Sequence, residues 1–269
     1  HCPNCLRPIA PLDNVPIFGW LLLRGECRRC GQPISVRYPA IEALSGLLWV
    51  AVYWMDVYAP DRAGLATFPF EAFLPLVYHG VLVSLLLVAT FIDYDYYIIP
   101  DAVTVPGMII GVVMGGLIPT IRPEPDTAHT MVSGFTTGLV GLVIGGGLVW
   151  LVRITASTVL RREAMGFGDV TLMAMVGSFL GWRIAVLTFF FAPFFAFAHL
   201  ARKLGLWIAD RLFPRGRARP LSRELPFGPY LSMAAVTLML SWDWLWTHWA
   251  RDFFEQFLMV CLFLGGMES

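Results

Sequence analysis

The chain has 269 residues, of which 57 % are hydrophobic and only 14 % are charged, and its mean hydropathy is +0.68. Soluble globular proteins carry about 25 % charged residues, so this composition excludes an ordinary soluble protein and favours a membrane protein that contacts the lipid bilayer. The formal net charge is zero and Lys203 is the single lysine, which argues against a basic nucleic-acid-binding surface, so we expect no nucleic-acid partner.

The chain opens with two cysteine pairs. Cys2-Pro-Asn-Cys5 is followed after 21 residues by Cys27-Arg-Arg-Cys30, a spacing close to that of zinc ribbons. Four thiolates fill a tetrahedral site, so the predicted zinc ion is structural. In an oxidising compartment the same residues would instead form two disulfides. We expect residues 1–38 to form a cytoplasmic zinc-binding domain.

Apolar windows of membrane-spanning length fill the remaining sequence. Because about 20 apolar residues cross a bilayer, we expect residues 39–269 to form an all-α polytopic membrane domain, with about seven or eight transmembrane helices in the chain. Glycine-rich runs at 111–116 and 145–147 are expected to allow close helix packing. The tail at 253–265 is an eighth span, an interfacial helix or a packed hairpin arm. The predicted spans are 40–58, 72–92, 102–121, 131–152, 169–182, 184–201 and 226–246.

Arginine is concentrated in three segments, at 7–37, 153–162 and 202–223. Short cytoplasmic connections carry an excess of positive charge, and one alternating topology puts all three segments, together with the turn at 93–101, on the cytoplasmic side. The long connection at 202–224 is expected to be a solvated loop facing lipid headgroups. For Glu42, near the start of the first span, three roles are open: a function, an ion pair with Arg37, or a side chain that reaches toward solvent.

Two acidic clusters lie at cytoplasmic ends of predicted spans. The first contains Asp93, Asp95 and Asp101, and the second is Gly166-Phe167-Gly168-Asp169. Ionisable groups at membrane depth are costly and are therefore functional candidates. Two carboxylates that face each other can share one proton and activate water against a peptide bond. The alternative is that they are ordinary polar helix ends, with Asp95 and Asp101 solvated or capping and Asp169 an N-cap.

These elements, in this order, resemble the bacterial type IV prepilin leader peptidases, a family of intramembrane aspartic proteases with a G-x-G-D element. The segments that carry the resemblance are HCPNC…CRRCG with the intervening NVPIFGWLLLRG, RYPAIEALSGLL, FIDYDYYIIPD, GFGDV and ELPFGPYLS. The last of these contains a rigid turn at Pro226–Pro229, and the resemblance implies that this turn lies near the active site and faces substrate.

The resemblance implies an endopeptidase with Asp93 and Asp169 as catalytic residues and no metal at that site, with Asp95 as the alternative to Asp93. Its substrates would be prepilins and pseudopilins, cut between Gly and Phe after a basic leader, at the cytoplasmic face of the bacterial inner membrane. It also implies S-adenosylmethionine-dependent N-methylation of the new terminal amine. Family members usually begin with a further span, so the resemblance implies a truncated chain.

Two other function classes are alternatives to the peptidase. A polytopic transporter or channel also uses intramembrane carboxylates, but its ionisable residues are expected near the middle of spans. A methyltransferase without protease activity, or a zinc-bearing scaffold of a secretion assembly, would tolerate the loss of Asp93 or Asp169. Substitution of these two aspartates therefore separates the hypotheses.

Overall fold

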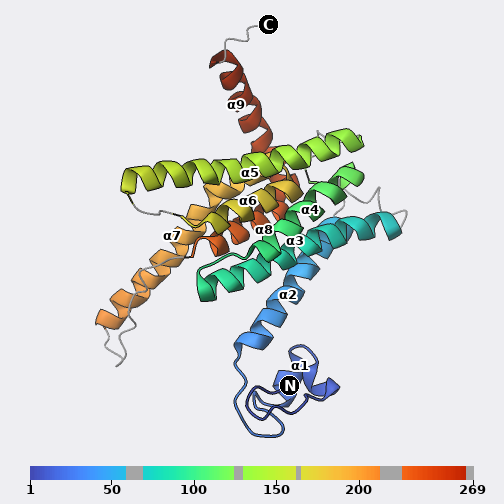
Figure 1. Cartoon of the computed structure of the whole chain (residues 1–269), viewed down its shortest axis with the longest axis vertical. Helices are drawn as coiled ribbons and strands as arrows, with labels where there is room; N and C mark the ends of the chain where they lie inside the picture. Colours follow the sequence, from blue (N-terminus) through green and yellow to red (C-terminus); the bar gives the residue numbers. More distant parts are fainter. Residues whose placement is uncertain (59–68, 124–129, 162–164, 213–225, 265–269) are drawn as a thin grey trace. The chain divides into compact units, whose positions relative to one another are not determined.

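The structure is a computed structural model that describes residues 1–58, 69–123, 130–161, 165–212 and 226–264 (Figure 1). The chain divides into two compact units, His1–Phe68 and Pro69–Ser269. In the described residues every regular element is helical, and an isolated bridge joins Glu26 and Pro33. The predicted all-α fold is confirmed, whereas the expected domain boundary after residue 38 stays a prediction.

The first unit combines a compact cysteine-bearing segment with one long helix. The segment contains a short 3-10 helix, η1 (Pro11–Asn14), and the five-residue helix α1 (Phe18–Leu22). The long helix α2 (Arg37–Tyr53) continues as a π-helical turn, η2 (Trp54–Tyr58). Together α2 and η2 form 22 residues that are long and apolar enough to cross a membrane, as predicted for 40–58.

The second unit is a bundle of helices joined by mostly short connections. Its elements are α3 (Pro69–Tyr96), α4 (Asp101–Leu117) with η4 (Pro119–Ile121), α5 (Met131–Leu160), α6 (Phe167–Leu180), α7 (Trp182–Leu212), α8 (Gly228–Leu245) with η5 (Trp246–Ala250), and α9 (Arg251–Leu264).

A helix occupies each of the seven predicted spans, and the protein is a multi-pass membrane protein. Among the described residues, four helices have membrane-spanning length and hydropathy: Arg37–Tyr58, Phe73–Tyr96, Met131–Leu160 and Trp182–Ile208. Helices α4 and α6 are apolar but shorter. The tail expected at 253–265 falls largely on α9, a 14-residue helix.

Two helices run past their expected ends. Helix α5 continues eight residues beyond 152, and there Thr155 donates a hydrogen bond to the Leu151 carbonyl (2.8 Å), so its polar side chain is satisfied within the helix. Helix α7 continues through Leu212, so the segment at 202–212 was wrongly predicted to be a loop. Residues 213–225, which hold the rest of that arginine-rich connection, lie outside the described residues.

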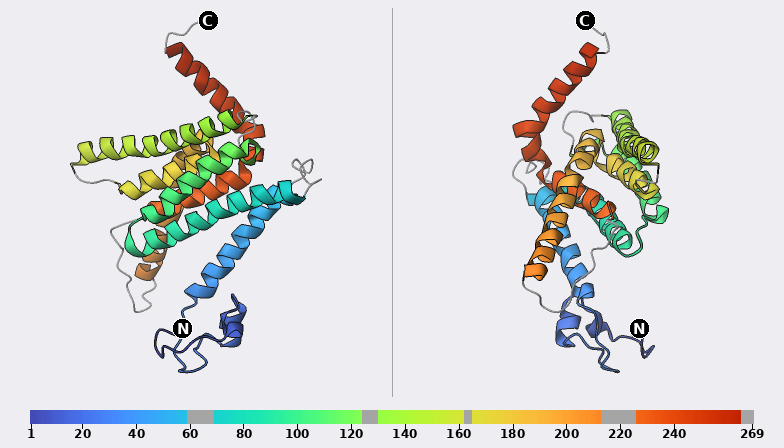
Figure 2. Two further views of the ribbon diagram at one scale, coloured as in Figure 1. Left: turned by 45° about the vertical axis from the view of Figure 1, so that its right-hand side comes forward. Right: turned by 90° about the vertical axis from the view of Figure 1, so that its left-hand side faces the viewer.

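Helix α6 forms the centre of the bundle. It is buried over nearly all of its length and contacts α4, α5, α7 and α8. Helix α5 lies beside α6 (Figures 1 and 2). The two helices approach closely at Gly141 and Gly177, where a Cβ on either glycine would collide with the backbone of the other, so only glycine permits this contact. The glycine runs at 111–116 and 145–147 therefore pack helices as predicted, except that Gly147 faces open space.

A buried arginine closes one end of this core. Arg122 is 4 % exposed, and its guanidinium donates hydrogen bonds to the carbonyls of Gly115 and Gly134 through Nη1 and of Gly111 and Ser178 through Nη2. Two of these carbonyls, those of Gly115 and Ser178, lie in the last turns of α4 and α6, where helix carbonyls lack partners and the helix dipole favours a cation. Arg122 therefore holds three helices together.

Candidate active site and four-cysteine cluster

The first aspartate of the site lies in the last turn of α3. Asp93 is only 6 % exposed, and its backbone carbonyl accepts a hydrogen bond from the N–H of Tyr97 (2.9 Å), which has a left-handed φ of 57° and ends the helix. The chain then runs through Ile98 and Ile99 before α4 begins. Helix α3 thus delivers Asp93 to a buried position, and the chain leaves the helix just after it.

The amino end of α8 meets Asp93. The backbone N–H of Gly228, the first residue of α8, donates a hydrogen bond to Asp93 Oδ2 (3.1 Å). Amide groups in the first turn of a helix lack internal partners and attract carboxylates. The approach requires glycine, because a Cβ at this position would lie 2.6 Å from the same oxygen. The sequence motif had marked this turn as near the site but had not identified this contact.

The second aspartate lies in the first turn of α6. Gly166 occupies the N-cap position, so Asp169 is the third residue of the helix, and the N-cap alternative is wrong. Its side chain is 7 % exposed. Gly168, just before it, packs on Ile99, where an added Cβ would lie 2.8 Å from the Ile99 Cβ. Gly228 also packs on Ile99, with the corresponding distance to Cδ1 at 2.9 Å.

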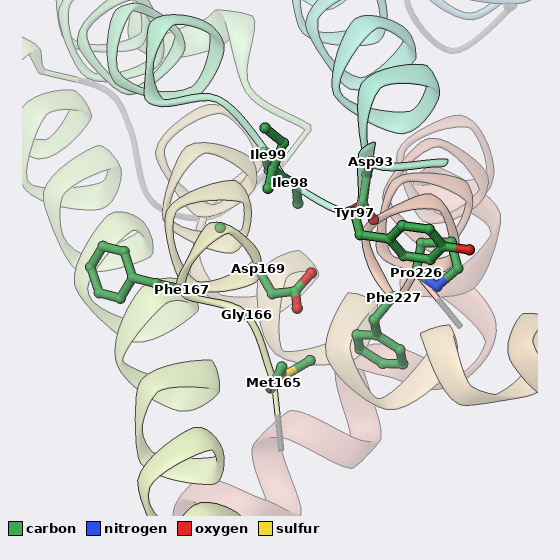
Figure 3. Close-up of a pocket in the computed structure, with 11 residues that line it drawn as sticks. Asp93, Tyr97, Ile98, Ile99, Met165, Gly166, Phe167, Asp169, Pro226 and Phe227 are labelled. Atoms are coloured by element: carbon green, nitrogen blue, oxygen red, sulfur yellow. The ribbon is translucent and has the colours of Figure 1, made fainter. Parts of the chain in front are cut away.

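Both aspartates line one pocket of about 300 Å³. In Figure 3 the carboxylate of Asp169 points toward the side of the pocket on which Asp93 lies. The remaining lining is mostly apolar and comes from the α3–α4 connection, the start of α6 and the residues before α8. The lining residues are Asp93, Tyr97, Ile98, Ile99, Met165, Gly166, Phe167, Gly168, Asp169, Pro226 and Phe227.

The other two acids of the first cluster lie elsewhere. Asp95 and Asp101 are both exposed, and neither lines the pocket. Asp101 is the first residue of α4, where a carboxylate is favourable to the helix dipole. The structure therefore brings Asp93, and not Asp95, together with Asp169.

An arginine from α5 supports the loop that leads into α6. Arg153 Nε donates a hydrogen bond to the carbonyl of Met165 (3.0 Å), and its guanidinium carbon lies 5.9 Å from the centre of the Phe167 ring. These contacts fix both sides of Gly166, at the start of the turn that presents Asp169. In the sequence Arg153 is only one of the charges of the segment at 153–162 that is predicted to be cytoplasmic.

The four cysteines of the first unit form a compact cluster. All four are free thiols whose sulfur atoms lie within 4.8 Å of one another, and Cys2 Sγ and Cys30 Sγ are 3.8 Å apart. A tetrahedral zinc ion with bonds of about 2.3 Å separates its sulfur ligands by about 3.8 Å, whereas a disulfide requires about 2.05 Å. The cluster also contains Cys5 and Cys27. Its geometry fits a tetrahedral metal ion.

The backbone of the cluster favours thiolates. Hydrogen bonds from the backbone N–H groups of Cys5 and Asn4 lower the pKa of the Cys2 thiol to about 6. A backbone hydrogen bond from Gln32 likewise lowers the pKa of Cys30. Metal ions bind the thiolate form, so these contacts prepare the cluster for a metal.

A bundle of apolar helices with two buried aspartates in one pocket matches the class of intramembrane aspartic peptidases. Residues 1–55 match the model of the Bacterial Peptidase A24 N-terminal domain, and residues 80–201 match that of the Type IV leader peptidase family. The chain belongs to the type IV leader peptidase family, as the resemblance of its motifs had predicted, and it is an enzyme of that family.

Curated relatives named prepilin leader peptidase/N-methyltransferase share much of this sequence. The protein of Aeromonas hydrophila is 33 % identical over 251 residues, which cover 92 % of this chain and 73 % of the relative. That of Pseudomonas putida is 31 % identical over 90 % of this chain and 72 % of the relative. That of Myxococcus xanthus is 37 % identical over 71 % of this chain and 50 % of the relative. No solved structure gives a significant match.

Proposed function

We propose that this chain is an intramembrane aspartic endopeptidase that removes the basic leader from type IV prepilins and pseudopilins, with Asp93 and Asp169 as its catalytic residues. The observation that carries the proposal is that these two buried carboxyl groups, 76 positions apart in the sequence, line the same pocket of a member of this family. The names of the relatives support the choice of substrate.

The pocket suggests how the two aspartates divide the chemistry. Two nearly buried carboxyl groups in one mostly apolar pocket favour a state that holds one proton between them. The ionised carboxylate takes a proton from a water molecule as that water attacks the scissile carbonyl carbon. The protonated carboxyl donates a hydrogen bond to the carbonyl oxygen, and a proton then passes to the leaving amine as the carbon–nitrogen bond breaks. The Gly228 amide holds Asp93 in place throughout.

The surroundings of the pocket fit a substrate with a basic leader and an apolar segment. Tyr97, Ile98 and Phe167 line the pocket and are also exposed, so they offer apolar surface to a residue on either side of the scissile bond. Asp95 and Asp101 are exposed on the segments that flank the pocket-lining Tyr97–Ile99 stretch, and negative charge there attracts a basic leader.

The proposal includes a metal, a membrane orientation and a second activity. Cys2, Cys5, Cys27 and Cys30 would hold one structural zinc ion, which leaves no coordination position for chemistry. The distribution of arginine supports an orientation in the bacterial inner membrane with this cluster and the pocket toward the cytoplasm. The relatives' names support transfer of a methyl group to nitrogen, and we propose S-adenosylmethionine as the donor and the new terminal amine as the acceptor.

The decisive experiment is cleavage of a synthetic peptide, a basic leader joined through Gly-Phe to an apolar helix, by the full chain in detergent. Asp93→Asn and Asp169→Asn keep side-chain size but remove the acid–base function, so cleavage is expected to fall by about 10²-fold or more. Asp95→Asn and Asp101→Asn are controls outside the pocket: they are expected to keep kcat near that of the wild type, while the weaker attraction of the basic leader raises KM.

The outcomes separate the candidate functions. Loss of cleavage in both pocket variants, with normal elution as a folded protein, supports the two-aspartate mechanism. Normal cleavage by either pocket variant rules that mechanism out and places the chemistry on other residues, whereas a folded wild type that does not cleave the peptide favours the transporter or the zinc-bearing scaffold. Methyl transfer is assayed separately, as a one-methyl mass gain of the cleaved product when S-adenosylmethionine is added.

A further inference from the structure

Helix α1 of the first unit presents a cluster of apolar side chains to its surroundings. Of its five residues only Gly19 is buried, while Phe18 is 65 % exposed, Leu21 56 % and Leu22 77 %. Large apolar side chains gathered on a short segment cost free energy in water, and such a surface usually has a partner. Within the first unit, α1 does not bury them.

Two hydrogen bonds fix α1 at the start of the membrane-spanning helix α2. The backbone N–H of Ile17, just before α1, donates to Glu42 Oε2 on α2 (2.7 Å). The indole N–H of Trp20 donates to the carbonyl of Ile34, three residues before α2 begins (2.9 Å). Figure 2 shows α1 beside the end of α2 at which that helix begins. Glu42, which sequence analysis left open, thus accepts a backbone hydrogen bond.

The position of Glu42 along α2 sets the depth of α1. The 22 residues of α2 and η2 span about 33 Å at 1.5 Å per residue, close to the hydrocarbon thickness of about 30 Å. Glu42 is five residues beyond Arg37, about 7.5 Å along the helix axis. A helix of about 33 Å centred on a hydrocarbon layer of about 30 Å begins about 1.5 Å above that layer, so Glu42 lies about 6 Å below the boundary between headgroups and hydrocarbon, within the depth that interfacial helices reach. The amino end of α1 is bonded to it at that level.

Basic side chains follow α1 directly. Arg24 and Arg29 are exposed, and Arg24 comes two residues after the helix ends. Arginine side chains place apolar methylenes along a membrane surface while the guanidinium reaches headgroup phosphates. The segment therefore joins an apolar surface to cationic groups, the combination found in helices that lie in the membrane interface.

We propose that α1 is an interfacial anchor: Phe18, Leu21 and Leu22 insert among the lipid headgroups and upper acyl chains of the membrane that α2 crosses, and the neighbouring arginines bind anionic headgroups. The anchor holds the four-cysteine module against the membrane surface. The partner is the lipid bilayer and not a protein.

The test uses the full chain in nanodiscs of phosphatidylethanolamine and phosphatidylglycerol. Leu22 is replaced by the photoreactive residue p-benzoylphenylalanine, and the products of irradiation are identified by mass spectrometry. Leu6, which is 74 % exposed but lies outside α1, next to Cys5, carries the same probe as the matched control. Lipid adducts are expected at Leu22 in a yield about tenfold above that at Leu6, because α1 is bonded to α2 at interfacial depth.

Each other outcome overturns the proposal. A crosslink from Leu22 to residues of the second unit means that α1 is covered by protein. Equal lipid labelling at both positions means that contact with lipid is not specific to α1, and the absence of lipid adducts at Leu22 means that α1 stays in water. Metal content verifies folding of each variant, and Phe18 replaced by the same aromatic probe serves as the second position if the Leu22 variant loses metal.

Discussion

Replacing Gly228 with alanine tests whether the position of Asp93 governs catalysis. Gly228 does not need a left-handed backbone, so alanine fits the helix and even favours it by about 0.5–1 kcal/mol. The added methyl group, however, would lie 2.6 Å from Asp93 Oδ2 and 2.9 Å from Ile99 Cδ1. The substitution therefore disturbs the pocket while leaving the helix itself intact.

The size of the effect follows from the distance. Relief of the contact from 2.6 Å to an ordinary 3.4 Å moves the carboxylate by about 0.8 Å and breaks its hydrogen bond with the Gly228 amide. A misplacement of about 1 Å in a catalytic group costs about 10²-fold in rate. We expect kcat/KM to fall by about 10- to 100-fold, which corresponds to about 1.4–2.7 kcal/mol of transition-state stabilisation.

The assay is cleavage of the Gly-Phe peptide, with thermal unfolding measured in the same detergent. Gly147→Ala is the matched control, because a Cβ at Gly147 meets nothing within 4 Å and the residue also lies in a helix. Equal kcat/KM for the two variants would refute the argument that the contact between α8 and Asp93 sets the geometry of the site. A Gly228→Ala variant that unfolds much earlier than the control would show that the contact supports the fold instead.

Three further changes probe the rest of the molecule. Arg122→Met removes hydrogen bonds to four carbonyls and should lower the free energy of unfolding by about 2–4 kcal/mol, whereas exposed Arg251→Met should change it by less than about 0.5 kcal/mol; equal thermal shifts would contradict this. Cys2→Ser should abolish the bound zinc seen by elemental analysis and spare peptide cleavage, since every pocket residue lies in the second unit; loss of cleavage at retained helicity would implicate the cluster in catalysis. Arg153→Met removes the hydrogen bond to the Met165 carbonyl and should lower kcat/KM by about tenfold with little change in unfolding temperature. An unchanged kcat/KM would mean that the loop before α6 keeps its conformation without Arg153.

Features set by local sequence were predictable. In lipid a segment must satisfy its own backbone hydrogen bonds, so apolar length alone indicates helices, and each of the seven predicted spans contains one. The cysteine spacing is likewise local, because each pair lies on one tight turn. Asp93 and Asp169 stood out because carboxylates at the ends of apolar helices are costly without a role.

Contacts between distant segments were not predictable in the same way. Gly228 and Asp93 are 135 positions apart, and nothing in either segment specifies that an amide of one will meet an oxygen of the other. In the sequence Arg122 looks like an ordinary charge between two predicted spans, yet it is buried among carbonyls of three helices. Hydropathy measures how polar a side chain is but does not identify the residues that contact it in the folded protein. A buried arginine and an exposed arginine therefore look the same in a sequence.

Ile99 shows what this distinction means for the enzyme. In the sequence it is one more apolar residue before a proline, but in the structure Gly168 of α6 and Gly228 of α8 both pack against its side chain. Each glycine lies next to one aspartate of the site: Gly168 precedes Asp169 in the chain, and the Gly228 amide donates a hydrogen bond to Asp93. Because both contacts are already tight, any helix movement that separates the aspartates must draw Ile99 away from at least one glycine. The α3–α4 connection therefore couples the two catalytic candidates mechanically as well as through the pocket they share.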